Sequence, residues 1–137
     1  MTVVVDASAM VEAFVGVLSG QTCLLMEEIE ENDVAAPHLI DSEVLHVLRK
    51  LEHRKVLSDE EADHVRELFT SLKITRYSAD GLLNRIWALR HNLTCYDATY
   101  VALAEVLDVP FLTTDARIAR ASGHGADVRV YEVAADR

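Results

Sequence analysis

Four acidic residues that lie far apart along the chain could together bind a divalent cation. They are Asp6, Glu43, Asp97 and Asp115. Carboxylate oxygens are the ligands that Mg²⁺ and Mn²⁺ prefer, and such an ion usually keeps several waters and binds a substrate phosphate as well. The spacing alone is not diagnostic, because the four are drawn from 23 acidic residues. Each position therefore needs its own argument.

Asp6 and Asp115 each follow a short apolar run, residues 3–5 and 111–112, that we expect to form a strand. Ligands of parallel α/β sheets bind at the carboxyl ends of the strands, so both acids fall where a site is expected. The alternative role for either residue is to cap the helix that follows. Ser8 offers a second capping group after the first strand, which would leave Asp6 free for another task.

Asp97 opens a helix whose residues are apolar on nearly all sides, from Ala98 to Leu107. A helix of this kind is expected to be buried, and burying an ionised carboxylate without a partner costs several kcal/mol. No Lys or Arg occurs between Arg90 and Arg117. We therefore expect either a metal ion or a basic side chain from elsewhere in the fold opposite Asp97.

Glu43 lies at the edge of the apolar stripe of a predicted helix that starts near His38. The stripe has helical spacing and consists of Val44, Val47, Leu48 and Leu51. At about 100° per residue, its centre lies roughly 80° from Glu43, so this side chain can face a cleft between helix and sheet. The alternative is a surface ion pair with Lys50 or Arg54.

Strand candidates alternate with helical segments along the whole chain. The predicted strands are short and mostly apolar, at 2–5, 33–36, 73–76, 110–112 and 128–130. Runs of this kind indicate strands covered on both faces, hence a mainly parallel sheet. We predict a three-layer α/β/α domain with a central sheet of four to five strands. Ser58, followed by an acidic turn that includes Glu61, is predicted to start one of the helices with a capping box.

The length of 137 residues fits one domain, which we expect to span residues 1–137. The apolar stretches are too short to cross a bilayer. The residues after Met1 have neither the basic region nor the cleavage site of a signal peptide. We therefore expect a cytoplasmic protein with its two cysteines reduced. The net charge of -10 opposes unspecific binding of nucleic acid. A nucleic-acid ligand would require that the negative charge be concentrated where a cation binds.

Four blocks of the sequence, in order, resemble those of PIN domains. They are Val3 to Ala9 with Asp6 and Ser8, Ala36 to Val44 with Glu43, Tyr96 to Ala104 with Asp97, and Phe111 to Arg117 with Asp115. The third and fourth blocks together form a fairly specific pair. With this length, the chain resembles the VapC group of toxin–antitoxin ribonucleases. One departure is His46, which stands where that group often has Asn.

The resemblance implies a ribonuclease in which Asp6, Glu43, Asp97 and Asp115 bind one or two Mg²⁺ ions, with Mn²⁺ as a possible substitute. Ser8 and Thr114 would hydrogen-bond an acid or a metal-bound water, and His46 is a further supporting candidate. The bound ion would activate water for phosphodiester hydrolysis, leaving 5′-phosphate and 3′-hydroxyl ends. The resemblance also implies a homodimer and a small VapB-like antitoxin, in a heterotetramer or larger complex.

Other functions stay open at this point. A PIN domain with a weak site can serve as a binding or scaffold partner, and a PIN-like nuclease can act on DNA or in RNA maturation without an antitoxin. A Rossmann nucleotide site is disfavoured, because no glycine motif follows the first strand. We also expect an RNA-facing rim that includes Lys50, Arg54 and Arg117, although these residues equally suit an ordinary solvated surface.

Overall fold

The computed structural model describes residues 1–20 and 23–133, and it contains one sheet of five strands. The strands are β1 (Thr2–Val5), β2 (Asp33–Pro37), β3 (Ile74–Tyr77), β4 (Phe111–Thr113) and β5 (Val128–Val130). Their spatial order is β3-β2-β1-β4-β5, and every neighbouring pair is parallel. The predicted sheet is confirmed, with β3 and β4 each shifted by one residue and β2 extended by one residue to Pro37.

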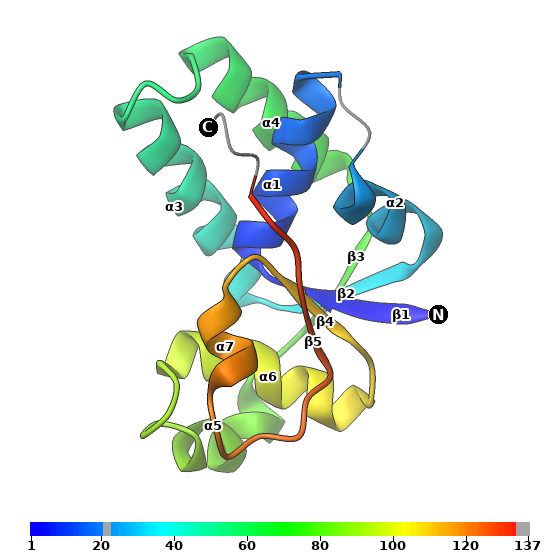
Figure 1. The fold of residues 1–137 in the computed structure, drawn as a ribbon, viewed down its shortest axis with the longest axis vertical. Helices are drawn as coiled ribbons and strands as arrows, with labels where there is room; N and C mark the ends of the chain where they lie inside the picture. The colour runs from blue at the N-terminus through cyan, green and yellow to red at the C-terminus, as the bar shows by residue number, and fades with distance from the viewer. Residues whose placement is uncertain (21–22, 134–137) are drawn as a thin grey trace.

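Helices cover both faces of the sheet. They are α1 (Ala7–Leu18), α2 (Leu24–Glu31), α3 (Leu39–His53), α4 (Asp59–Ser71), η1 (Asp80–Leu82), α5 (Leu83–Ala88), α6 (Cys95–Leu107) and α7 (Ala116–Arg120). Figure 1 shows α1 to α4 on one side of the sheet and α5 to α7 on the other. This arrangement confirms the three-layer α/β/α fold.

The core forms where the sequence is continuously apolar. Val3, Val4 and Val5 of β1 are fully buried, because this central strand has a helical layer on each face. In α3, the predicted stripe turns inward: Val44 and Leu48 are buried, and the other two members of the stripe are packed against the core. The capping box of Ser58 and Glu61 at the start of α4 is present in both directions.

Helix α6 departs from its prediction. Its residues from Ala98 to Ala104 are buried as expected, but Val106 in the last turn is 67% exposed and Asp97 in the first turn is partly exposed. The sheet packs against one side of α6 and α5 against another, and the exposed residues lie toward the two ends of the helix. Asp97 is therefore a residue of the rim of the core and not of its interior.

Two further expectations can be compared with the described residues. Cys23 and Cys95 are both free thiols, as predicted. Within the described ranges, none of the helices is both long and apolar enough to cross a membrane.

Candidate active site

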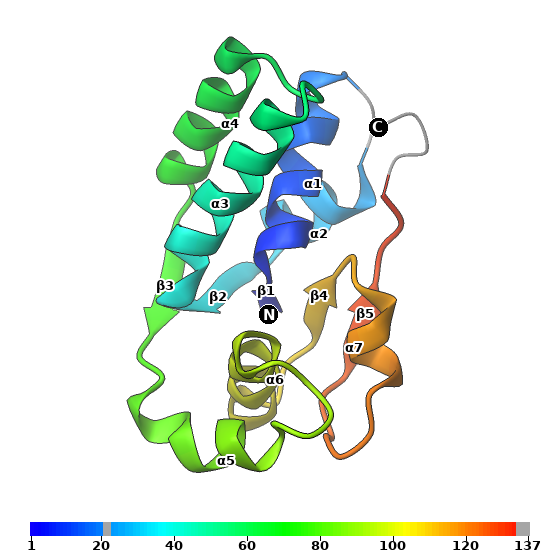
Figure 2. The same cartoon turned by 90° about the vertical axis from the view of Figure 1, so that its left-hand side faces the viewer.

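The fold carries all four acids to the carboxyl edge of the sheet. Asp6 directly follows β1, and Asp115 lies two residues after β4. Glu43 lies in the second turn of α3, which follows β2, and Asp97 in the first turn of α6, which runs back toward the start of β4. Figure 2 looks onto this edge, where the first turns of α3 and α6 approach the end of β1. Because parallel strands end at one edge, residues distant in sequence become neighbours there.

Asp97 is the electrostatic centre of this group. Burial raises the pKa of Asp6 to about 6, and the charge of Asp97 adds to the rise. Burial also raises the pKa of Glu43, again with a contribution from Asp97. The pKa of Asp97 itself is raised by partial burial and by Asp115. The structure therefore brings Asp97 within electrostatic range of the other three acids, whose mutual repulsion a cation would relieve.

Asp6 is held by three hydrogen bonds. One carboxylate oxygen accepts from the Ser8 hydroxyl at 2.8 Å and from the Ala9 amide at 3.0 Å, and the other accepts from the Thr113 hydroxyl. Asp6 is thus the N-cap of α1. The expectation that Ser8 would cap the helix in its place is wrong, because Ser8 lies inside the first turn and its hydroxyl donates to Asp6 instead.

Thr113 is a site residue that the sequence analysis missed. It is fully buried at the end of β4, and its hydroxyl also accepts from the Asp115 amide at 3.1 Å. Side chains two apart on a strand share one face, so Thr113 faces the same way as Phe111. The predicted strand ended at residue 112, and because of this one-residue error the sequence analysis did not place Thr113 on the strand.

Arg117 supplies part of the counter-charge expected opposite Asp97. Its guanidinium pairs with both carboxylate oxygens of Asp115, at 3.0 and 2.8 Å, and it lowers the pKa of Asp115. It also lowers the pKa of Asp97 to a smaller extent. The side chain of Arg117 is 82% exposed, so solvent screens the pair and an incoming cation can replace it.

The chemistry of this donor set fits a hard divalent cation. Asp6, Glu43 and Asp97 offer only oxygen ligands, and burial together with neighbouring acids raises their pKa values, so a bound cation would favour their ionised forms. Among the described residues, no three acidic, histidine or cysteine side chains already converge on one point at metal-binding distance. Binding would therefore require reorientation of the carboxylates and release of Asp115 by Arg117.

The supporting candidates are placed as follows. His46 is exposed on α3 but close enough to lower the pKa of Glu43. Thr114 contacts the site through its backbone amide, which points to the Ser8 hydroxyl at 3.4 Å. Lys50 and Arg54 are exposed, yet α3 carries them roughly 10 and 16 Å along its axis from Glu43. Figures 1 and 2 show that end of α3 far from α7, which bears the third predicted rim residue.

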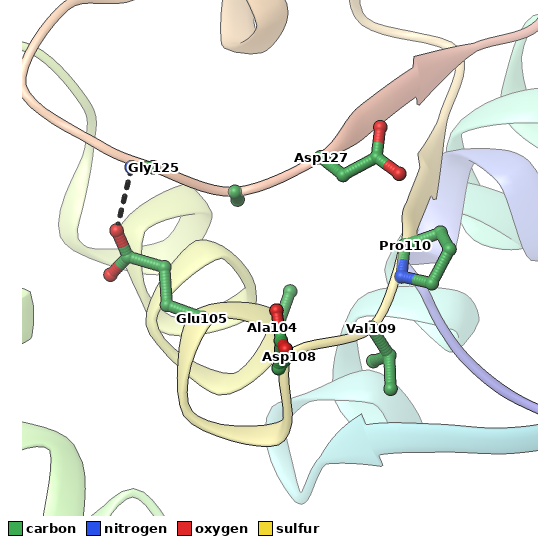
Figure 3. Close-up of a pocket in the computed structure, with 8 residues that line it drawn as sticks. Ala104, Glu105, Asp108, Val109, Pro110, Gly125 and Asp127 are labelled. Carbon is green, nitrogen blue, oxygen red and sulfur yellow. Dashed lines mark hydrogen bonds between the residues drawn. The ribbon is translucent and has the colours of Figure 1, made fainter.

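A pocket of about 310 Å³ lies at the opposite edge of the sheet (Figure 3). It is formed by the last turn of α6, the start of β4 and the segment that leads into β5. Glu105 on its wall is already engaged by Arg85 at 2.8 Å and by the Gly125 amide at 2.8 Å. We therefore assign this pocket a structural role in fixing the loop before β5.

Comparisons with known proteins agree with the fold. A model of the PIN domain matches residues 3–123. Ribonuclease VapC1 of Mycobacterium tuberculosis is 40% identical over 93% of this chain and 96% of its own length. VapC ribonuclease Mb0985 of Mycobacterium bovis is 38% identical over 85% of this chain and 87% of its own.

Two solved structures resemble the chain as well. PAE2754 from Pyrobaculum aerophilum has a TM-score of 0.63 and 25% identity, covering 93% of this chain and 84% of its own. VapBC2 from Rickettsia felis, solved bound to a DNA fragment from its promoter, has a TM-score of 0.67 over 96% of this chain and all of the matched chain. At 14% identity, the second likeness concerns the fold alone.

Proposed function

The chain belongs to the PIN-domain family, among its VapC ribonucleases, and from this premise we propose that it is a Mg²⁺-dependent endoribonuclease acting as the toxin of a toxin–antitoxin pair. The observation that carries the proposal is the position of Asp97, which interacts electrostatically with Asp6, Glu43 and Asp115 at one edge of the sheet. These four carboxylates are proposed to hold the cation, with Mn²⁺ as an alternative to Mg²⁺.

The ion would lower the pKa of a bound water and neutralise charge on the scissile phosphate. Hydrogen bonds within the chain orient the carboxylates that would bind the ion. Ser8 and Thr113 fix the two oxygens of Asp6, and the Thr94 hydroxyl accepts from the Asp97 amide at 3.1 Å and so fixes the first turn of α6. Hydroxyl donors such as those of Ser8 and Thr113 orient metal ligands and add to the metal affinity of the site.

The proposed partners follow from charge and from the family. The substrate is RNA, and the inhibitor is a small VapB-like antitoxin with basic residues. The contact between Arg117 and Asp115 supports this, because it shows that a guanidinium fits against the acidic edge. A net charge of -10 favours a basic partner. We further propose that the protein acts in the cytoplasm as a homodimer, which the antitoxin joins in a heterotetramer or larger complex.

The proposal is tested by incubating antitoxin-free protein with total cellular RNA, once with Mg²⁺ and once with EDTA. We expect cleavage only with Mg²⁺, restored when excess Mg²⁺ is added back, and products with 5′-phosphate and 3′-hydroxyl ends. Cleavage at the same rate in EDTA would contradict the metal-dependent reaction. Cleavage of DNA but not RNA would favour a nuclease outside the toxin group.

An Arg117→Glu variant tests the proposed RNA rim. If Arg117 neutralises one phosphate of the bound RNA, its reversal weakens binding of all sequences alike and reduces the slope of log affinity against log salt by about 1. The measurement is RNA binding by fluorescence anisotropy across salt concentrations. Arg66→Glu, the same change on the exposed surface of α4, is the control. Equal salt slopes for the two variants would count against a rim at Arg117.

A further inference from the structure

Tyr100 places a hydroxyl group in the core beside the candidate active site. Its side chain is 1% exposed, and its ring stacks on that of Phe111 with centroids 5.9 Å apart. The hydroxyl oxygen is buried, and no described residue meets it with a hydrogen bond of ordinary length and angle. A buried hydroxyl without a partner costs free energy. A phenylalanine would fill the same space and stack equally well without that cost, so packing alone does not explain the hydroxyl.

Three of the proposed metal ligands act on this hydroxyl electrostatically. Glu43 interacts with it most strongly, followed by Asp6 and Asp97. In return, the hydroxyl lowers the pKa of Glu43. The Glu43 carboxylate is therefore near the Tyr100 hydroxyl, although no hydrogen bond of ordinary geometry joins the two groups. Tyr100 follows Asp97 by about one helical turn on α6, so the two side chains lie on the same face of this helix.

We propose that Tyr100 is a positioning residue for Glu43, whose carboxylate accepts a hydrogen bond from the Tyr100 hydroxyl when a divalent cation is bound. Glu43 comes from a helix on the opposite face of the sheet from α6, and it is less buried than Asp6. A donor on α6 would hold one Glu43 oxygen and leave the other for the ion. This inference rests on the proposed function and deepens it.

Asp6 and Glu43 differ in how well their oxygens are fixed, and this difference supports the assignment. Both oxygens of Asp6 accept hydrogen bonds from the protein. The Glu43 carboxylate has no hydrogen bond of this kind from Tyr100, whose nearby hydroxyl lowers the pKa of Glu43, and His46 acts on that pKa through its charge. Loss of a donor that orients a metal ligand typically costs 10–100-fold in metal affinity.

The test is a Tyr100→Phe substitution in the full chain, with Mn²⁺ binding measured by isothermal titration calorimetry. Because the ring and its stacking stay, we expect the melting temperature in EDTA to be unchanged or higher. Mn²⁺ affinity should fall by about 10–100-fold. Tyr131→Phe, at a partly buried tyrosine whose charged neighbours are Glu28 and Arg129, should bind Mn²⁺ like the wild type.

A Glu43→Gln background separates positioning from general effects on the core. There the added Tyr100→Phe change should weaken Mn²⁺ binding by much less than it does in the wild type, because the carboxylate it positions is gone. Equal Mn²⁺ affinity of wild type and Tyr100→Phe would overturn the inference while leaving the proposed function intact. A wild-type protein that neither binds Mn²⁺ nor cleaves RNA would overturn both.

Discussion

An Asp97→Asn variant is expected to lose at least about 100-fold in RNA cleavage at saturating Mg²⁺. Loss of a residue that only supports a metal ligand typically costs 10–100-fold, and Asp97 is proposed to be a ligand itself. The substitution keeps the shape of the side chain. It also keeps the amide of residue 97 that donates to Thr94. The measurement is the initial rate of cleavage of a fixed RNA, with the melting temperature recorded for the same preparation.

Asp108→Asn is the matched control for this prediction. Asp108 caps the other end of α6 with a φ of 54°, a conformation that asparagine tolerates well. It is exposed at the opposite edge of the sheet, so the variant removes the same charge from the same helix. We expect wild-type cleavage. If both variants cleaved RNA equally, Asp97 would have no special place in the reaction.

An Asp6→Asn variant is expected to be more stable than the wild type near neutral pH in the absence of divalent cations. Burial raises the pKa of Asp6 from 3.8 to about 6 in the folded state. Between these values the folded protein holds a proton that the unfolded chain has released, so stability falls as the pH rises through this range. Above this pH range, ionisation of Asp6 lowers the free energy of unfolding by about 3 kcal/mol. This is a large share of the 5–15 kcal/mol by which a typical domain is stable.

The asparagine removes this cost, and its oxygen can still accept from Ser8 and Ala9, which share one oxygen of Asp6. Urea unfolding in EDTA should therefore favour the variant at pH 7.5 by as much as about 3 kcal/mol, with the two proteins converging near pH 4. Added Mg²⁺ should stabilise the wild type and narrow the gap. A variant that is less stable than the wild type at pH 7.5 would show that the ionised Asp6 carboxylate does not destabilise the folded protein.

The fold was largely predictable because it depends on local patterns. The apolar runs located all five strands, and the stripe of α3 and the capping box at Ser58 predicted two helices. The spatial order β3-β2-β1-β4-β5 was not predicted, since it is set by packing between distant segments. The burial of α6 was overestimated for the same reason, because a helical pattern does not reveal how far the neighbouring layer extends.

The candidate site was predictable only in part. Asp6 and Asp115 were located by the rule for strand ends. Glu43 was singled out mainly by the family resemblance, since its place beside an apolar stripe equally suits a surface ion pair. Thr113 and Tyr100 were missed. The Thr113 hydroxyl bonds Asp6, which lies 107 residues away in the sequence. The Tyr100 hydroxyl acts on Glu43, which lies on another layer of the fold. No spacing rule identifies such contacts. Arg117 was predicted to face RNA, but its most direct contact in the structure is with Asp115.

The central claim is that the carboxylates around Asp97 form a divalent-metal site, and a crystal of the antitoxin-free protein soaked in Mn²⁺ tests it most directly. The anomalous difference map should contain a peak about 2 Å from a carboxylate oxygen of Asp97 and of at least one other member of the group, with Arg117 turned away from Asp115. A map with no peak at this edge, or with its main peak beside Glu105 in the pocket at the opposite edge, would contradict the claim.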